Sequence, residues 1–503
     1  MPEPESQPRP SVLVIGAGPA GLTAAHRLGE RGFQATVLEK DSRYVGGISK
    51  TVSYKGFHFD IGGHRFFSKS REVEDYWREV LGDDIIERPR KSRIFYNRKL
   101  FSYPLKPVDA LVKLGPLQAA LCVLSYLKAR LRPIPEPKNF EEWITNQFGS
   151  RLFSIFFRTY TEKVWGMKCT EISADWAAQR IKGLSMGKAI LNAVMPRRGG
   201  GEVIKTLIDS FRYPRRGPGM MWEATAHAVA AAGGRVEMDR ELTAAAWDAG
   251  RRCWRVTCRD AAGGEHRYEA QHLISSMAIR ELVAGLTPAP SAAAARAAAA
   301  LKYRDFLIVA LMLKDRGQFD DNWIYIHAPE VKVGRIQNFK SWSPDMVPDP
   351  ELNCYGMEYF CFEGDALWSA DDRTLIELAT RELVELGLAR GEDIVDGHVI
   401  RQEKAYPVYD ECYQDNVETV RREIAARYPN LHLVGRNGMH KYNNQDHAIM
   451  TAMLTVENIV AGEPLYDVWR VNQDAEYHEE GGAGADLVLA DSERLTPMRA
   501  VPS

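Results

Sequence analysis

The sequence predicts an α/β protein with a Rossmann-type FAD-binding domain, a helical insertion and a substrate domain of antiparallel sheet. Three observations at the N-terminus predict the first of these. A β-prone run at 11–15 leads directly into the turn 16–21, which spells G-x-G-x-x-G. A helical segment follows at 22–30, and a second apolar run at 34–38 ends at Glu39. This order of strand, glycine turn, helix, strand and carboxylate is typical of dinucleotide binding.

Each part of this motif has a physical role in holding a pyrophosphate. Gly16 permits the tight turn, Gly18 lets the backbone approach the phosphates, and Gly21 lets the helix pack on the strand. Pro19 and Ala20 lie in the turn directly before the helix, whose N-terminal N–H groups and positive dipole end face the phosphates. These five residues are therefore predicted cofactor contacts.

The residues after the second strand favour FAD over NAD. Glu39 is expected to accept hydrogen bonds from the ribose hydroxyls, and Lys40 follows it. Two glycine pairs come next, one ending at Gly47 and one at Gly63, which precedes His64. Glycine pairs suit backbone that lies against a flat ring or a phosphate, because no Cβ intervenes. A plain turn is the alternative for the second pair.

Composition limits the class of protein. The chain has 503 residues, of which 45% are hydrophobic and 26% charged, enough for two or more domains of a soluble globular protein. The net charge of −2 provides no general attraction for nucleic acid. Seven scattered cysteines without a C-x-x-C pair predict free thiols in a reducing compartment and no metal site. The polar start, 1–10, is not a secretory signal, so a cytoplasmic protein is expected.

One segment, 111–131, has an apolar character that is interrupted by Lys113, Gly115 and Pro116. It lacks the ~20 apolar residues that a membrane-spanning helix requires. The favoured interpretation is an amphipathic helix that packs on the domain. The alternative is a helix at the inner face of the membrane, with neighbouring lysines and arginines near lipid headgroups.

Periodicity along the chain predicts six segments. Three of them together form the FAD-binding domain: 1–90, 211–290 and 411–470. The segment 91–210 is a mostly helical insertion that begins with a hairpin turning at Asn97 and Arg98. The segment 291–410 is an antiparallel-sheet substrate domain that roofs the flavin. The polar, aperiodic segment 471–503 is predicted to be a disordered tail.

Several motifs resemble a known family. The N-terminal glycine motifs resemble those of amine oxidases, protoporphyrinogen oxidases, phytoene desaturases and UDP-galactopyranose mutases. Later segments are most similar to the mutases, in order and spacing, over residues 12–460. These segments are 63–67 (GHRFF), 160–165 (YTEKVW), 406–409 (YPVY), 435–442 (GRNGMHKY) and 444–447 (NQDH).

The resemblance implies an enzyme of cell-surface polysaccharide biosynthesis that interconverts pyranose and furanose forms of a phosphate-activated sugar. FAD, active as FADH2 after priming by NAD(P)H or another reductant, attacks the anomeric carbon through N5. The implied catalytic residues bind the phosphate or form the sugar pocket: His64, Tyr160, Trp165, Tyr406, Arg436, Lys441 and Tyr442. Further implied cofactor contacts are Val236, Gly435, Asn444 and Gln445.

Two positions depart from the family. Lys441 stands where arginine is usual, and Lys314-Asp315 follow the roof strand where the mutases place an arginine on the sugar-nucleotide diphosphate. Lysine is a point charge and cannot reproduce the planar fork of arginine. The sugar is therefore left open between nucleotide-linked and polyprenyl-linked forms. The alternative function is an FAD-dependent oxidoreductase acting on a lipid-like or small-molecule substrate; the oligomeric state is not predicted.

Overall fold

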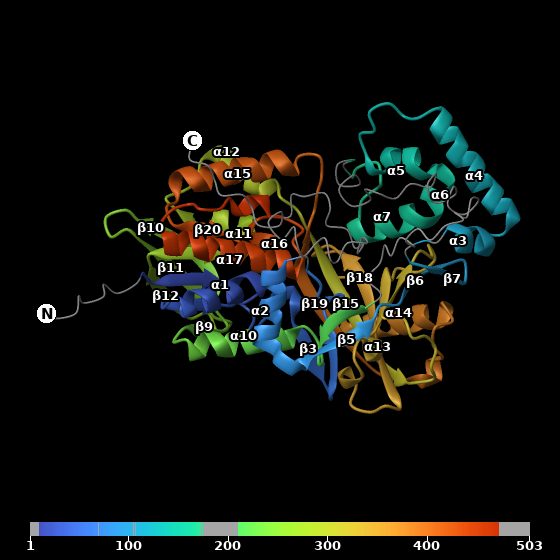
Figure 1. The fold of residues 1–503 in the computed structure, drawn as a ribbon, viewed down its shortest axis with the longest axis horizontal. Coiled ribbons are helices and arrows are strands. Elements are labelled where there is room, and N and C mark those ends of the chain that lie inside the picture. Colours follow the sequence, from blue (N-terminus) through green and yellow to red (C-terminus); the bar gives the residue numbers. More distant parts are fainter. Residues whose placement is uncertain are drawn as a thin grey trace, which may run out of the picture.

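The computed structural model describes residues 10–471 except 69, 104, 106, 173 and 175–209, and of 107 and 108 it describes the backbone only. The dinucleotide-binding part lies at one end of an elongated molecule, a large sheet lies beside it, and a group of helices lies at the far end (Figure 1). Almost all of the predicted tail, 471–503, falls outside the described residues.

A five-stranded parallel sheet forms the centre of the dinucleotide-binding part, as the sequence predicted. In spatial order its strands are β20 (Leu431–Leu433), β13 (His272–Ser275), β1 (Val12–Ile15), β2 (Ala35–Leu38) and β9 (Arg235–Glu237). All four residues of β1 are buried, because it has a strand on each side, helices on one face and a second sheet on the other. The carboxyl end of β1 leads into the glycine turn, so this edge of the sheet is where a ligand is expected.

Helices from three distant parts of the chain cover this sheet. They are α1 (Pro19–Glu30), α2 (Arg71–Leu81), α10 (Gly219–Ala231) and α17 (Gln445–Ala461). Their apolar faces and β1 share one core, in which Trp77 and Trp222 are fully buried. The sequence also predicts helices at 446–460 and 224–232; the first agrees with α17 almost to its ends, whereas α10 begins five residues before the second.

A smaller sheet flanks the first. Its strands, in spatial order, are β12 (Glu265–Ala270), β11 (Cys253–Arg259), β10 (Glu241–Asp248) and β14 (Leu286–Thr287). The sequence also predicts a hairpin of strands at 255–258 and 266–270; it corresponds to β11–β12, and β10 extends it. The alanine-rich α12 (Ala292–Ala300) packs with α11 (Ile279–Ala284) and α15 (Tyr413–Arg427) on this side of the molecule. The predicted boundary at 291 therefore falls before a helix that belongs to the dinucleotide-binding part.

The roof is a seven-stranded mixed sheet. In spatial order its strands are β19 (Ile394–Pro407), β15 (Tyr303–Lys314), β18 (Leu352–Cys361), β17 (Arg335–Asn338), β16 (Trp323–Ile326), β6 (Ser92–Tyr96) and β7 (Lys99–Ser102). β15 is buried on both faces, and its alternate side chains belong to two different cores. One of these cores includes α14 (Asp372–Glu385).

The hairpin β6–β7 turns at Asn97 and Arg98, as predicted, and both residues have positive φ. It does not belong to the helical insertion, because β6 pairs in parallel with β16 and so extends the roof sheet. Other short elements connect the parts: η1 (Gly47–Ser49), β3 (Thr51–Tyr54), β4 (Phe57–Asp60), β5 (Ile85–Pro89), β8 (Ser210–Pro214), α13 (Phe339–Trp342) and α16 (Gly435–Gly438).

The helical group forms the far end of the molecule (Figure 1). Its elements are α3 (Pro107–Leu114), α4 (Pro116–Leu131), α5 (Phe140–Phe148), α6 (Ser150–Phe153), a π-helical stretch (Ser154–Arg158) and α7 (Thr159–Trp165). The apolar segment 111–131 is split by Gly115, whose φ is 86°. Among the described residues no helix is long and apolar enough to cross a membrane.

The turn between β1 and α1 has no room for a side chain at its last glycine. A Cβ on Gly21 would lie 1.9 Å from the carbonyl oxygen of Gly16, which is rigid backbone. We expect Gly21→Ala to lower the free energy of unfolding by more than about 2 kcal/mol, because the strand and helix must move apart. Thermal unfolding of the purified variant measures this.

The matched control is Gly391→Ala, at a glycine of ordinary φ whose Cβ would have no neighbour closer than 4.0 Å. It should change stability by less than about 0.5 kcal/mol. Equal unfolding temperatures for the two variants would contradict the packing argument.

Candidate functional site

The glycine turn and the first glycine pair face each other. A Cβ on Gly18 would meet only the Cα of Gly47, at 4.0 Å, and the residue caps α1 without a side-chain hydrogen bond. The first N–H groups of α1 therefore point into a backbone-lined gap. Pro19 and Ala20 lie in the first turn of that helix, and a phosphate fits such a gap because no side chain occupies it.

Glu39 occupies the end of β2 beside this gap. Its carboxylate is buried and accepts hydrogen bonds from the N–H of Ala17 at 2.6 Å and of Asp41 at 2.9 Å. Burial raises the pKa of Glu39, while these N–H donors act in the opposite direction. Val236 lies two strands away from β1, on β9, paired with Val37 of β2.

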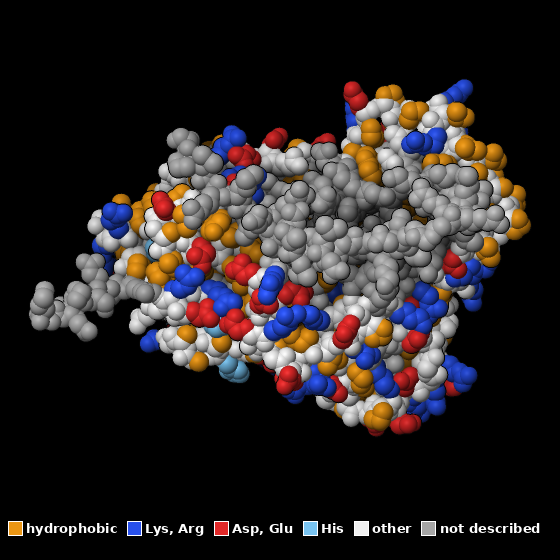
Figure 2. All heavy atoms as spheres, in the orientation of Figure 1, with side chains coloured by type: hydrophobic (Ala, Val, Ile, Leu, Met, Phe, Trp, Pro, Cys, Tyr) orange, Lys and Arg blue, Asp and Glu red, His pale blue; other side chains and the backbone are white. Residues whose placement is uncertain are grey.

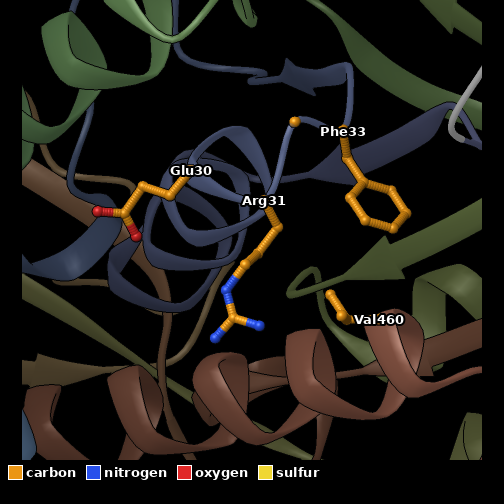
Figure 3. Close-up of a pocket in the computed structure, with 5 residues that line it drawn as sticks. Glu30, Arg31, Phe33 and Val460 are labelled. Atoms are coloured by element: carbon orange, nitrogen blue, oxygen red, sulfur yellow. The ribbon is translucent and has the colours of Figure 1, made fainter. Parts of the chain in front are cut away.

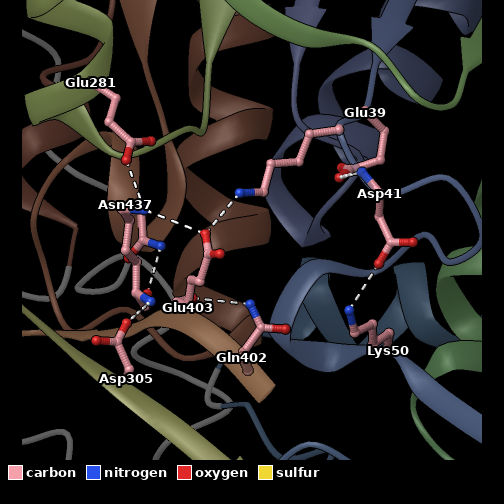
Figure 4. Close-up of polar contacts among 10 residues, drawn as sticks. Glu39, Asp41, Lys50, Glu281, Asp305, Gln402, Glu403 and Asn437 are labelled. Atoms are coloured by element: carbon pink, nitrogen blue, oxygen red, sulfur yellow. Dashed lines mark hydrogen bonds and ion pairs between the residues drawn. The ribbon is translucent and has the colours of Figure 1, made fainter. Parts of the chain in front are cut away.

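A polar network ties this edge to the roof sheet (Figure 4). Lys40 forms an ion pair with Glu403 of β19 at 2.9 Å, and Lys404 pairs with Glu281 at 2.7 Å. The Asn437 amide donates to the Lys404 carbonyl at 2.8 Å. The ammonium of Lys40 thus contacts the roof strand, so its predicted contact with the cofactor is not part of this arrangement.

The second glycine pair leads into a cluster of cations and aromatic rings. A Cβ on Gly62 would lie within 4 Å of three groups: the Arg335 guanidinium, His64 Nε2 and the Tyr406 hydroxyl. A Cβ on Gly63 would press on Trp342 at 3.1 Å. The chain that follows β4 is therefore in close contact with β17 and β19 of the seven-stranded sheet.

His64 is neutral in this cluster. Its Nε2 lies 2.9 Å from the carbonyl oxygen of Ile61, so we assign the ring proton to Nε2. Burial, together with the nearby charges of Arg436 and Arg335, lowers the pKa of His64 to about 4. The imidazole therefore adds no charge to the site near neutral pH.

Arg436 lies beside two stacked tyrosines and donates hydrogen bonds to two backbone carbonyls. The rings of Tyr406 and Tyr442 stack with centroids 5.6 Å apart, and the Arg436 guanidinium lies 5.5 Å and 5.0 Å from them. Its Nε donates to the Asn443 carbonyl at 2.9 Å and its Nη1 to the Ala405 carbonyl at 3.0 Å. Arg436 is thus fixed in place, and part of its donor capacity is already used.

Arg335 is a site residue that sequence reasoning missed. It lies on the short strand β17, and its Nε donates to Glu358 of β18 at 2.5 Å; Gln337 binds the other carboxylate oxygen. Burial opposes the charge, but Glu358 raises the pKa of Arg335 well above its usual value. The sequence provides little signal for it, because β17 reads Arg-Ile-Gln-Asn and the family resemblance placed a phosphate-binding arginine at the end of β15, where Lys314 stands.

The helix α7 brings Tyr160 and Trp165 to the same cluster. Tyr160 stacks on His327 with centroids 5.1 Å apart and meets Tyr325 edge-on. Trp165 is buried, with its ring 6.5 Å from that of Tyr442. Burial raises the pKa of Tyr160 well above its usual value, so its hydroxyl remains a hydrogen-bond donor.

A buried arginine positions this helix. Arg304 of β15 donates to the carbonyls of Val164 at 3.1 Å and Lys163 at 3.3 Å, which are the last carbonyls of α7. A Cβ on Gly166 would collide with the guanidinium at 2.6 Å. Lys163 is also structural, since its ammonium donates to Ala328 and Val333 carbonyls.

Lys441 does not join the cluster, contrary to the sequence-based expectation. Its ammonium donates to the carbonyls of Trp469, at 2.7 Å, and Val471, at 2.5 Å. These bonds anchor the last described turn of the chain. The physical reason is position: the residue follows the short helix α16 and points away from the tyrosine pair.

The start of α17 shows a buried polar group suited to a ligand. Asn444 caps the helix, together with His447. Gln445 is 7% exposed, and neither its amide nitrogen nor its oxygen has a hydrogen-bond partner among the described residues. An unpaired buried amide is costly unless a ligand satisfies it. Gly435, preceding this helix, approaches Ala20 of α1, so both helix N-termini converge on one region.

A hollow of about 680 Å³ lies at the opposite end of α1 and is lined by Glu30, Arg31, Phe33 and Val460 (Figure 3). Arg31 is already paired with Glu457 there at 2.7 Å. This end of α1 presents carbonyls, which repel anions. The hollow is therefore unrelated to the cluster described above.

The arrangement defines a dinucleotide-binding fold whose open edge lies below a sheet that carries aromatic rings and Arg335, with Arg436 beside them on α16. A family model described as an NAD(P)-binding Rossmann-like domain matches residues 14–80. Among solved structures, reduced UDP-galactopyranose mutase is similar over 98% of this chain and 100% of that chain, with a TM-score of 0.78 and 22% identity. A putative protoporphyrinogen oxidase from Exiguobacterium sp. 255-15 covers 91% and 100%, with a TM-score of 0.70 and 16% identity.

Curated relatives match over shorter stretches. A probable UDP-galactopyranose mutase from Klebsiella pneumoniae is 24% identical over 173 residues, 33% of this chain and 43% of that protein. The L-amino acid oxidase Cdc18 of Crotalus durissus cumanensis is 34% identical over 112 residues, 20% and 22% of the two chains. The chain thus spans less than half the length of these relatives. The predicted fold class and the resemblance to UDP-galactopyranose mutase are confirmed at the level of the fold.

The gap between Gly18 and Gly47 allows a test that separates cofactor binding from folding. Gly18→Val should fold, because a Cβ finds open space there, but its side chain would occupy the phosphate gap. We expect FAD affinity to fall at least about tenfold, equivalent to about 1.4 kcal/mol. Titration of the apoprotein with FAD, followed by flavin fluorescence, measures this. An unchanged affinity would place the pyrophosphate elsewhere.

The low pKa of His64 predicts a pH dependence of stability. The unfolded chain binds a proton near pH 6.5, whereas folded His64 does so only near pH 4. The stability that neutral His64 gives the folded state is complete above pH 6.5 and is lost as the pH falls toward 4. In the apoprotein, His64→Gln should therefore lose less stability than wild type between pH 7 and pH 5, by at most about 2 kcal/mol. Thermal unfolding at both pH values tests this, and identical losses would contradict it.

Proposed function

We propose that this protein is an FAD-dependent mutase that interconverts ring forms of a phosphate-activated sugar. The observation that carries the proposal is the cluster below the roof sheet. It joins two fixed arginines, Arg335 and Arg436, with Tyr160, Tyr406 and Tyr442 at the carboxyl edge of the dinucleotide-binding sheet. Two guanidinium groups beside phenol donors are suited to a sugar phosphate or diphosphate.

The residues present fit FAD. Gly16, Gly18 and Gly21 would hold the pyrophosphate, Glu39 at the end of β2 would accept hydrogen bonds from the ribose, and Val236 lies on the strand next to β2. At the other end, the unpaired amide of Gln445 and the N-terminus of α17 offer hydrogen bonds to a polar ring edge. Gly47, Gly63, His64, Gly435 and Asn444 would contact the cofactor between these ends. Reduced FAD, when bound, supplies a nucleophile for the anomeric carbon, after priming by NAD(P)H or another reductant.

The protein's own residues hold the sugar and neutralise the leaving phosphate. Arg335 and Arg436 supply fixed positive charge, which stabilises the phosphate as it separates from the sugar. Tyr160, Tyr406 and Tyr442 donate hydrogen bonds to its oxygens, and Trp165 forms an apolar wall beside the ring. Because His64 is neutral, it positions the glycine loop without competing for the anion. The buried seven-stranded sheet above the cluster limits the access of water to the sugar and phosphate.

An oxidoreductase is the second candidate, because similarity to flavin-type oxidases also extends along the chain. The L-amino acid oxidase and protoporphyrinogen oxidase matches support it. A phytoene desaturase from Cercospora nicotianae is 41% identical, but over only 59 residues, 12% of this chain. An oxidoreductase acting on an apolar substrate has no evident use for two arginines fixed beside the tyrosine cluster, so the mutase is favoured.

The deciding experiment is incubation of purified, FAD-loaded protein with UDP-galactose, with and without dithionite, followed by chromatographic separation of pyranose and furanose products. Interchange that needs reduced flavin but consumes no stoichiometric reductant is expected. Consumption of one O2 or NAD(P)H per product, or equal activity of the oxidised protein, would assign the oxidoreductase function instead.

Arg335 provides a test of phosphate binding. Arg335→Lys keeps a positive charge beside Glu358 but removes the planar fork. We expect FAD retention to be unchanged and the KM for the sugar phosphate to rise about tenfold or more, from the loss of a charge-assisted hydrogen bond. The control is Arg316→Lys, at an exposed residue paired with Asp393. If both variants have the wild-type KM, the phosphate is bound elsewhere.

A further inference from the structure

The helix α4 exposes a row of leucines at the far end of the molecule. Leu117, Leu121, Leu124, Leu127 and Leu131 are 72%, 40%, 61%, 48% and 82% exposed. Their spacing of three or four residues places them on one side of the helix. The neighbouring Val112 of α3 is 74% exposed. α4 packs against α5 and α6, as the favoured expectation has it, but it buries only Cys122 and Ala129 and leaves this row of leucines uncovered.

This leucine face, defined by the five leucines of α4, is large for a surface feature. Seven of the eleven most exposed large hydrophobic side chains among the described residues lie between Val112 and Ile134. Scattered apolar side chains are ordinary on a protein surface, but contiguous ones mark an interaction site. In Figure 2 hydrophobic side chains follow the outer edge of the molecule, where α4 lies in Figure 1.

Positive charge accompanies the leucine face. Lys128, Arg130 and Arg132 are exposed at the C-terminal end of α4, and no ion pair joins them to any other described residue. The helix itself contains no Asp or Glu. Lys113 differs from these three, because Asp109 pairs with it at 2.6 Å. An apolar face with uncompensated cations at one end is complementary to an anionic, apolar surface.

We propose that α4 binds the surface of a membrane that contains anionic lipid, lying in the plane of the interface. The leucines would enter the boundary between headgroups and acyl chains, and the three cations would contact lipid phosphates. The helix lies parallel to the surface and does not cross it, since no described helix is long and apolar enough to do so.

A second copy of the chain fits this face less well. Two α4 helices packed in parallel through their leucines would bring both sets of Lys128, Arg130 and Arg132 close together, and in either orientation neither helix carries an acid to offset them. Like charges across an interface cost free energy. A negatively charged lipid surface removes this repulsion and buries the same leucines.

The experiment is co-sedimentation of the full chain, loaded with FAD, with vesicles of phosphatidylcholine alone or mixed with phosphatidylglycerol. We expect binding to the mixed vesicles that weakens at high ionic strength, and little binding to neutral ones. Leu124→Gln with Leu131→Gln should reduce partitioning roughly tenfold or more per leucine. Lys128→Gln with Arg130→Gln should reduce it about fivefold per residue and weaken the salt dependence.

The matched control applies the same change to exposed apolar residues elsewhere: Val384→Gln with Val395→Gln, which are 40% and 54% exposed. It should bind vesicles as wild type does, and the FAD content of all variants confirms that they are folded. Absence of wild-type binding at low salt, or equal loss in the control, would overturn the proposal. So would sedimentation analysis showing a dimer in solution that the leucine variant abolishes, since the face would then be an interface between copies.

Discussion

The close approach of backbone segments at the carboxyl edge of the parallel sheet is the constraint on which this structure depends. At Gly21 the helix α1 meets the carbonyl of Gly16, and at Gly438 the chain meets the carbonyl of Ser275, where a Cβ would lie only 2.5 Å away. Gly435 approaches Ala20 in the same region. These contacts bring α17 and Arg436, from the end of the chain, beside the first phosphate-binding turn. A side chain at any of these glycines would separate the cofactor edge from the residues that serve it.

Fixed charges are the second organising feature. Arg304, Arg335 and Arg436 are all held by protein acceptors: backbone carbonyls for the first and last, and Glu358 for Arg335. Burying a guanidinium is costly unless its hydrogen bonds are satisfied. Because the protein supplies those bonds, the arginines are oriented before any ligand binds. Arg304 orients the helix that carries Tyr160, whereas the other two face the aromatic cluster directly.

The two ends of the molecule differ in how completely their helices are buried. At the dinucleotide-binding end, β1 and α17 are almost entirely buried, and small residues let helices pack closely. At the helical end, α4 buries two side chains and leaves its leucines in contact with solvent. The helix is held instead by packing with α5 and α6. Such an asymmetry separates a rigid part that positions a cofactor from a part suited to contact with another surface.

The sequence by itself determined the Rossmann-type part, because strand, glycine turn and helix are local patterns with fixed periods. It also identified Tyr160, Tyr406, Arg436 and Tyr442 as a group through a family resemblance. Only the tertiary structure decided that Arg335 joins them, that Lys441 turns away, and that the hairpin at 92–102 extends the roof sheet. Strand neighbours and side-chain directions depend on contacts between residues distant in sequence, which no local period encodes. The exposure of the α4 leucines has the same cause: the sequence shows an apolar face, and packing decides what covers it.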